Sequence, residues 1–369
     1  MNEDFLHKKL NERKAQNAYR QLRLPDNKID FCSNDYLGIA KMNLISHPTA
    51  NYQLPTTNLH NGSTGSRLLS GNYELIEEAE KLIAQFHEAE TGLIFNSGYD
   101  ANVGFMSCVP QRGDTIIYDY LSHASIRDGI RLSFAESFSF AHNRLDDLEK
   151  KLKAAKGNIF VVTESVFSMD GDYAPLLEIS LLCEKYNANL IIDEAHATGV
   201  VGEKGGGLVQ HLQLQEKCFA RVHTFGKAVG CHGAAIIGSE TLRNYLINFS
   251  RAFIYTTSLP ETSVAAIKNA YQIFPQMNEE RSHLTNLINQ FQNASIGFEK
   301  LKSETPIQIV IVPGNDAVKR LAQQLQENNF DVRPIVYPTV PKGSERLRIV
   351  MHAFNTSEEV GGLVERLKS

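Results

Sequence analysis

The sequence has no apolar run that approaches the roughly 18 residues of a membrane-spanning helix, so we expect none. Its five cysteines are scattered and form no C-x-x-C pair, which indicates reduced thiols in a cytosolic protein. No apolar segment follows the N-terminus, and acidic residues stand among its basic ones, so we expect neither a secretory signal nor a transit peptide. The net charge of −5 is small, so nucleic acid and membranes are not expected partners. We therefore expect a cytoplasmic protein.

The composition is that of a globular protein, with 42% hydrophobic and 21% charged residues and no repeats or low-complexity tracts. The length of 369 residues predicts two or three domains. It is sufficient to bury a core without disulfides or metals, and we expect no metal site.

Short apolar runs alternate with segments of helical spacing through the first two thirds of the chain. The runs are 92–95, 115–118, 159–163, 190–192, 222–225 and 234–237. Helical spacing occurs in 75–86, 145–152 and 176–186. This alternation predicts an α/β fold with a mostly parallel sheet that helices cover on both faces.

The C-terminal third departs from this alternation. A long helical segment at 261–291 contains Pro275, which we expect to kink or split it. After it we expect, in order, a strand at 307–312, a helix at 317–328, a strand at 346–351 and a helix at 357–367. We therefore predict an N-terminal arm (1–45), a large α/β domain (46–265) and a smaller α+β domain (266–369).

Open parallel sheets bind ligands at the carboxyl ends of their strands, and Asp193 follows the apolar run 190–192. The segment 193–196 reads DEAH, a helicase-like signature that requires a G-x-x-x-x-G-K-[ST] phosphate loop. In the one suitable Gly-Lys segment, Arg221 stands in place of the first glycine and Ala228 follows the lysine, which argues against nucleotide hydrolysis. A carboxylate that caps the next helix is the structural alternative.

Three further segments follow apolar runs. Lys227 ends the segment TFGK, although most lysines are solvated surface groups. The segment NSGY (96–99) opens a helix, where backbone N–H groups can bind an anion or simply form a cap. His123 lies in SHAS (122–125), and a lone histidine is more often structural than catalytic.

Together these segments meet the requirements of pyridoxal phosphate. A lysine forms a Schiff base with its aldehyde, and a carboxylate pairs with its protonated pyridine nitrogen. A helix terminus binds the phosphate, and a histidine can stack on the ring.

Nine segments match one known family in order along nearly the whole chain. They are FCSNDYLGIA (31–40), GSRLLSGNYELIEEAE (65–80), FNSGYDAN (95–102), LSHASIRDG (121–129), HNRLDDLE (142–149), TESVFSMDGDYAPL (163–176), IIDEAHATGVVG (191–202), HTFGKAVGCHGAA (223–235) and ERLRIVMHAFNT (345–356). The sequence resembles the α-oxoamine synthases, which are fold-type-I pyridoxal phosphate enzymes. This resemblance implies an aspartate-aminotransferase-like fold with a mostly parallel seven-stranded sheet and a smaller α+β C-terminal domain.

The resemblance also implies residue roles. Lys227 would bind the cofactor covalently and move the substrate α-proton, Asp193 would bind the pyridine nitrogen, and His123 would stack on the ring. The family forms homodimers with shared sites, so one of two threonines would reach the partner's phosphate. The other residues implied around the cofactor are Ser97, Gly98, Tyr99, Glu164, Ser168, His196, Thr224, Thr256 and Thr257. Glu164 could instead be a buried hydrogen-bonding group.

For the substrate, the resemblance implies that Asn34 and Arg348 hold the amino-acid carboxylate, with the arginine as a bidentate fork. Arg346 is an alternative, because residues two apart on a strand share a face. Asn34 could also cap a turn. Arg20 is implied to bind substrate, and Thr339 to contact the acyl chain.

The expected reaction is a decarboxylative condensation of L-alanine with a pimeloyl thioester, carried by coenzyme A or an acyl carrier protein. Other amino-acid and acyl thioester pairs, an aminotransferase, and a non-catalytic partner subunit are the alternatives. The last is disfavoured, because such chains lack the lysine that stands here at position 227. Prolines interrupt the helix expected within 41–61, which leaves the acyl-chain preference open.

Overall fold

The computed structural model describes residues 2–24, 26–42, 44 and 60–368. Packing divides the chain into two compact units. The smaller unit comprises Met1–Tyr36, Met169–Asp172 and Ser282–Ser369, and the larger unit comprises Leu37–Ser168 and Tyr173–Arg281. Most of the segment 41–61, whose order we could not predict, lies outside the described residues. Among the described residues, no helix is long and apolar enough to cross a membrane.

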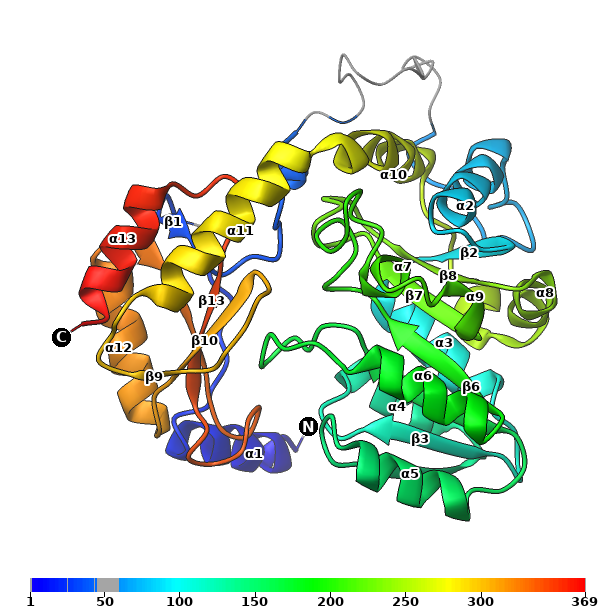
Figure 1. Cartoon of the computed structure of the whole chain (residues 1–369), viewed down its shortest axis with the longest axis horizontal. Helices are drawn as coiled ribbons and strands as arrows, with labels where there is room; N and C mark the ends of the chain where they lie inside the picture. The colour runs from blue at the N-terminus through cyan, green and yellow to red at the C-terminus, as the bar shows by residue number, and fades with distance from the viewer. Residues whose placement is uncertain (1, 25, 43, 45–59, 369) are drawn as a thin grey trace. The chain divides into compact units, whose positions relative to one another are not determined.

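A seven-stranded sheet forms the centre of the larger unit (Figure 1). Its strands are β2 (Thr91–Phe95), β3 (Thr115–Asp119), β4 (Glu136–Phe140), β5 (Ile159–Glu164), β6 (Ala188–Asp193), β7 (Ala220–Thr224) and β8 (Ala234–Gly238). They lie in the order β2-β8-β7-β6-β5-β3-β4. Only β8 is antiparallel to its neighbours, which confirms the predicted mostly parallel seven-stranded sheet.

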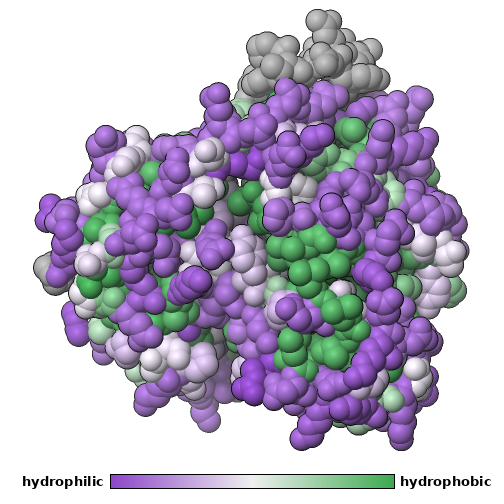
Figure 2. All heavy atoms as spheres, viewed as in Figure 1, coloured by the Kyte–Doolittle hydropathy of each residue, from purple (hydrophilic) through white to green (hydrophobic). Residues whose placement is uncertain are grey.

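Helices cover both faces of this sheet. In Figure 1, α5 (Leu145–Ala154) and α6 (Leu176–Lys185) lie in front of the sheet, and α3 (Gly98–Cys108) and α4 (Ala124–Leu132) lie behind it. Side chains of α3, α4, α8 (Glu240–Phe249) and α9 (Arg251–Ile254) form one apolar core with the strands. On the outer surface over α6, apolar side chains such as Leu177 and Leu181 are exposed (Figure 2).

The six apolar runs between residues 92 and 237 all form strands of this sheet, as predicted. The seventh strand, β4, was not predicted. This strand lies at the edge of the sheet, and Phe140 is its only buried residue. A strand with so little buried surface leaves no apolar run in the sequence.

The smaller unit is built on a four-stranded antiparallel sheet, in the order β12-β13-β10-β9. Its strands are β9 (Glu299–Lys300), β10 (Ile307–Ile311), β12 (Arg333–Ile335) and β13 (Arg346–Val350). A separate parallel pair joins β1 (Ile29–Asp30) to β11 (Phe330–Asp331). The helices are α1 (Asp4–Ala15), α12 (Asn315–Glu327), α13 (Ser357–Arg366) and most of α11 (Asn278–Asn293).

Packing groups the chain differently from the expected domains 1–45, 46–265 and 266–369, which remain a prediction. The packing boundary follows Arg281 rather than residue 265, because α10 (Glu261–Ile273) packs against α2 (Glu74–Phe86) in the larger unit. The N-terminal residues belong to the smaller unit, since β1 pairs with β11. As predicted, the long helix is split at Pro275, by a 3₁₀ turn at Phe274–Gln276.

Candidate active site

The carboxyl ends of β5, β6 and β7 form one edge of the large sheet, which we call the strand-end edge. Glu164, Asp193 and Thr224 are the last residues of these three strands. The strands are parallel neighbours, and Glu164 lies opposite Asp193 in register. This is the edge at which ligands bind in open α/β sheets.

Asp193 is buried, with 6% of its surface exposed. Its Oδ2 accepts a hydrogen bond from Asn102 Nδ2 at 2.7 Å, and its Oδ1 accepts one from the Ala195 backbone N–H at 2.9 Å. Two N–H donors from different segments therefore fix the orientation of this carboxylate.

Lys227 lies in the loop between β7 and β8, which also contains Gly230. Backbone hydrogen bonds from Phe225 to Gly233, from Cys231 to Phe225 and from Gly230 to Lys227 close this loop tightly. Lys227 Nζ is 2.8 Å from His196 Nε2, in the turn after β6. A lysine ammonium only donates, so His196 Nε2 accepts this bond when Lys227 is charged.

His123 and Glu164 lie beside these groups. The His123 backbone N–H donates to Glu164 Oε1 at 2.6 Å. Burial raises the pKa of Glu164 to about 8, with a further increase from the charge of Asp193 and a decrease from Lys227. Burial also lowers the pKa of His123, while Asp193 acts to raise it and Lys227 to lower it. The charges of Asp193 and Lys227 thus act on both groups, which places all four in one neighbourhood.

The start of α3 lies beside Thr224. The first N–H groups of a helix have no acceptor within the helix, and Ser97 Oγ caps one of them by accepting from the Asp100 N–H at 3.0 Å. A Cβ at Gly98 would lie 3.2 Å from Thr224 Oγ1, so glycine keeps this space open. The Tyr99 hydroxyl donates to Asp128 Oδ2 at 2.7 Å. The sequence-predicted anion site is thus a helix start with a hydroxyl beside it.

Two more of the predicted residues adjoin this helix start. Asn96 Nδ2 donates to Thr256 Oγ1 at 3.0 Å and to the Thr257 carbonyl at 2.7 Å. Ser168, which the resemblance also implies at the cofactor, is half-buried and ends the segment Leu37–Ser168 of the larger unit.

The predicted substrate residues lie in the smaller unit and form two pairs. Arg348 Nη2 donates to Asn34 Oδ1 at 2.9 Å, and Arg348 is almost fully buried. The alternative, Arg346, forms an ion pair with Asp170 and donates to the Met169 carbonyl at 3.0 Å. The charge of Arg346 is therefore balanced by a carboxylate, whereas Arg348 meets a neutral amide.

The second pair joins Arg20 and Thr339, both exposed. Arg20 Nη2 donates to Thr339 Oγ1 at 3.4 Å across more than 300 residues of sequence. The structure thus brings together the two residues that the resemblance assigns to substrate and acyl chain.

Sequence reasoning gave no role to Glu194, although it is fully buried. Its carboxylate accepts from the backbone N–H groups of Leu208 and Val209 at 3.0 and 2.6 Å, and from Ser165 Oγ at 3.0 Å. It therefore caps α7 (Leu208–His211), the role considered above for its neighbour Asp193.

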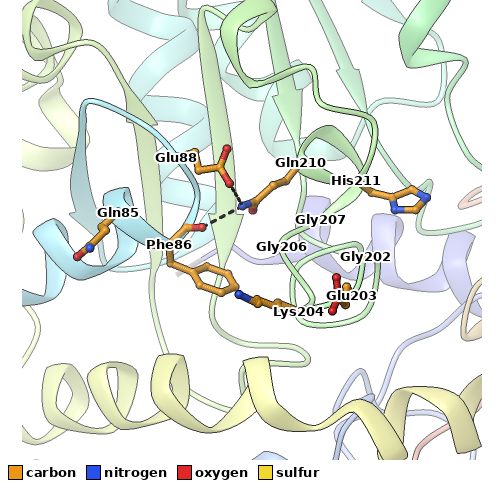
Figure 3. A pocket seen from close by; sticks show the side chains of 10 residues that line it. All are labelled: Gln85, Phe86, Glu88, Gly202, Glu203, Lys204, Gly206, Gly207, Gln210 and His211. Carbon is orange, nitrogen blue, oxygen red and sulfur yellow. Dashed lines mark hydrogen bonds between the residues drawn. The ribbon is translucent and has the colours of Figure 1, made fainter.

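A cavity of about 520 Å³ lies at the glycine-rich loop that precedes α7 (Figure 3). Gln210 Nε2 donates there to the Phe86 carbonyl at 3.1 Å and to Glu88 Oε1 at 2.9 Å. None of the predicted site residues lines this cavity, so it is separate from the strand-end edge.

Sequence reasoning also missed Asn102 and Ser125. Asn102 is 2% exposed on α3, and its amide donates both to Asp193 and to Ser125 Oγ, the latter at 3.0 Å. A polar residue between apolar ones on a core helix is the signal that could have revealed it.

The donor set fits pyridoxal phosphate. It offers an amine, a buried carboxylate held by N–H donors, an imidazole, and a helix start with space at Gly98. Among the described residues, no group of three or more His, Cys, Asp or Glu side chains is placed to hold a metal ion.

The family model for aminotransferase class I and II matches residues 26–367. The chain belongs to this family. It is 41% identical to the 8-amino-7-oxononanoate synthase of Emericella nidulans over 99% of this chain and 94% of that protein.

Two solved structures illustrate the fold. A serine palmitoyltransferase from S. paucimobilis, solved with PLP and myriocin bound, has a TM-score of 0.89 and 25% identity, over 99% of this chain and 96% of that one. An 8-amino-7-oxononanoate synthase from Francisella tularensis has a TM-score of 0.77 and 28% identity, over 93% and 98%. The predicted fold-type-I architecture is thereby confirmed.

Proposed function

We propose that this chain is a pyridoxal phosphate-dependent acyltransferase that condenses L-alanine with a pimeloyl thioester and releases carbon dioxide, the activity of an 8-amino-7-oxononanoate synthase. The observation that carries the proposal is the contact of Lys227 with His196 at the edge that holds the buried Asp193. Full-length similarity to proteins of that name supports the choice of reaction.

Pyridoxal phosphate, when bound, supplies an aldehyde that condenses with amines and an electron sink for the α-carbon. Lys227 would bind it, Asp193 would hold its ring nitrogen, and His123 would cover the ring. The start of α3, with Ser97, Gly98, Tyr99 and Thr224, would bind the phosphate.

Proton movement falls to Lys227. A lysine acts as a base only when its amine is uncharged, and a neighbouring imidazole can receive its hydrogen bond. His196 Nε2 is placed for this at 2.8 Å. Burial raises the pKa of Glu164 to about 8, so this carboxyl stays protonated and neutral near pH 7, beside Asp193.

In the smaller unit, we propose that Arg348 and Asn34 bind the amino-acid carboxylate. Arg348 already donates to Asn34, the other residue of the pair, whereas Arg346 is held in an ion pair with Asp170. The pair Arg20 and Thr339 would contact the acyl substrate.

We further propose a cytoplasmic homodimer with shared sites, in which Thr256 or Thr257 reaches the partner's phosphate. Large apolar side chains at Leu69 and Tyr255 are exposed, at 84% and 72%. Tyr255 precedes Thr256, which accepts a hydrogen bond from Asn96, just before α3. Leu69 follows Gly65, whose carbonyl accepts from the Ser258 N–H in the same segment as Thr256. Both side chains therefore belong to segments that adjoin the start of α3. This surface is where we expect the partner.

A second candidate is a serine palmitoyltransferase-type activity, in which the same residues act on serine and a longer acyl thioester. It is favoured by the TM-score of 0.89, against 0.77 for the synthase from Francisella tularensis. The sequence identity favours the first candidate, at 41% against 25%.

A product mass assay tests the proposal. The purified chain with pyridoxal phosphate is offered alanine, glycine or serine with acetyl-, succinyl-, pimeloyl- or palmitoyl-coenzyme A. A decarboxylated adduct from alanine and the pimeloyl thioester alone is the expected result. An adduct from another pair would replace this substrate assignment, and the absence of any adduct, also with pimeloyl carrier protein, would contradict the reaction.

A further inference from the structure

A continuous chain of hydrogen bonds joins Asp193 to His123 through two residues to which no role has been assigned. Asn102 Nδ2 donates to Asp193 Oδ2 at 2.7 Å and to Ser125 Oγ at 3.0 Å. Ser125 Oγ lies 2.7 Å from His123 Nδ1, and the Ser125 backbone N–H donates to the same nitrogen at 3.2 Å. Asn102 and Ser125 are 2% and 0% exposed, so water does not replace these bonds.

The direction of each bond follows from its donors. A carboxylate only accepts, so the Asn102 amide faces Asp193 with its NH₂ group. The second amide hydrogen is donated to Ser125 Oγ, so the single hydroxyl hydrogen of Ser125 is available for His123. The Ser125 backbone N–H donates to His123 Nδ1, so this nitrogen is an acceptor without a hydrogen of its own and also accepts the Ser125 hydroxyl hydrogen. A neutral His123 must carry its hydrogen on Nε2.

This arrangement exceeds what stability requires. Buried polar side chains are costly unless every group is satisfied, and two apolar residues at these positions on α3 and α4 would avoid the cost. These hydrogen bonds instead link the carboxylate of Asp193 to the imidazole of His123, the two groups that the proposed function places against a cofactor ring.

We propose that Asn102 and Ser125 are positioning residues, which orient the Asp193 carboxylate and hold His123 as the tautomer with hydrogen on Nε2. The Nε2–H group, on the ring nitrogen that Ser125 does not contact, is then a fixed donor suited to the carbonyl oxygen of an acyl substrate. The tautomer assignment stands by itself, whereas its catalytic consequence rests on the proposed function.

The first test is the titration of His123, read by ¹⁵N NMR on the full chain with labelled histidine and pyridoxal phosphate added. Wild type is expected to show neutral His123 with its hydrogen on Nε2. In Ser125→Ala the neutral form loses a hydrogen-bond donor, so we expect the pKa of His123 to rise by about 0.5–1 unit and the second tautomer to appear. Ser125→Thr keeps the hydroxyl and should restore the wild-type titration.

Ser180→Ala is the matched control, since Ser180 is a buried helical serine that donates to the Leu177 carbonyl at 2.7 Å. Its His123 titration should match wild type. If Ser125→Ala also titrates like wild type, or if wild-type His123 carries its hydrogen on Nδ1, the tautomer assignment is wrong.

The second test concerns Asp193. Asn102→Leu removes both amide donors at similar volume, and we expect kcat to fall about 10–100-fold while KM for the amino acid stays within about threefold. In this variant the pH dependence of the visible absorbance of the bound cofactor should also differ from that of wild type. Asn269→Leu is the control, because Asn269 is a fully buried helical asparagine that donates to the Leu44 carbonyl.

The two failures are distinguishable. A wild-type chain that binds no pyridoxal phosphate contradicts the proposed function but leaves the NMR result interpretable. A wild-type chain that turns over substrate, with Asn102→Leu equal to Asn269→Leu in kcat and in its cofactor spectrum, contradicts the positioning role.

Discussion

Asp193 and Glu194 are consecutive acids that serve two different regions of the larger unit. Asp193 turns toward α3 and belongs to the strand-end edge with Lys227 and His123. Glu194 turns toward the glycine-rich loop, where it caps α7 and takes no part in that edge. Adjacent side chains of an extended segment point to opposite sides, so the four-residue motif 193–196 supplies one carboxylate to the strand-end edge and one cap to α7.

The two regions also differ in how their histidines are held. His123 has both charged and hydrogen-bonding neighbours at the strand-end edge. His87 and His223 instead stack on each other, with ring centroids 3.7 Å apart, and both are fully buried. His87 binds the Gly206 carbonyl and Tyr271, and His223 binds Thr198. We therefore expect changes at one region to alter catalysis and changes at the other to alter stability.

The largest effect is expected for Asp193→Asn. Loss of the negative charge beside the ring nitrogen should lower kcat by about 10²–10³-fold, as is typical when an electrostatic partner of the reaction is removed. An amide fits the same space but turns its NH₂ group toward one of the two donors, and the Asn102 side chain can rotate to accept from it, so the thermal midpoint should fall by only a few degrees. Steady-state kinetics measures kcat, and calorimetry measures the thermal midpoint. A variant that is unstable but fully active when folded would contradict the assignment of Asp193 to catalysis.

Glu194→Gln should show the opposite pattern. The amide places an NH₂ group against one of the donors at Leu208, Val209 or Ser165, which costs about 1–3 kcal/mol for a buried group. We expect the thermal midpoint to fall by roughly 2–8 °C while kcat per folded molecule changes less than about threefold. A loss of kcat as large as that of Asp193→Asn would assign Glu194 to the active site.

The histidine pair should make stability depend on pH. Burial lowers the pKa of His87 and of His223 well below the usual value, so both stay neutral in the folded chain. Below about pH 6.5 the unfolded chain takes up protons that the folded chain does not, and stability falls as the pH falls. His87→Gln should lower the thermal midpoint at pH 7.5 but reduce its fall between pH 7.5 and 5.5. Exposed His211→Gln is the control, and equal slopes in all three proteins would refute the account.

Glu164 should have the reverse pH dependence. Its pKa is raised to about 8 from 4.5, chiefly by burial, so the folded chain keeps a proton that the unfolded chain loses between these values. Stability therefore falls as the pH rises from about 4.5 to 8. Glu164→Gln does not titrate and should gain several degrees of thermal midpoint relative to wild type between pH 5.5 and 8.5. Exposed Glu178→Gln should run parallel to wild type, and a parallel Glu164→Gln would contradict the assignment.

The sequence was sufficient for six of the seven strands of the large sheet, because buried strands leave apolar runs, and for the position of Asp193 at the carboxyl end of one of them. The roles of Asp193 and Lys227 stay predictions. The sequence was insufficient for β4, which is an exposed edge strand, and for α10, whose packing on α2 is a long-range contact. Nor could it separate Arg346 from Arg348, since the ion pair with Asp170 depends on a segment more than 170 residues away. The polar position of Asn102 on a core helix is visible in the sequence, but its partners and those of Ser125 are not.

The central claim is that the strand-end edge binds pyridoxal phosphate through Lys227. Reduction of the cofactor-loaded chain with borohydride, followed by proteolysis and mass spectrometry of the peptides, tests it most directly. We predict a single pyridoxyl adduct on the peptide that contains Lys227, and none in Lys227→Ala. An adduct on another lysine, or an unmodified Lys227 in protein that has bound the cofactor, would contradict the claim.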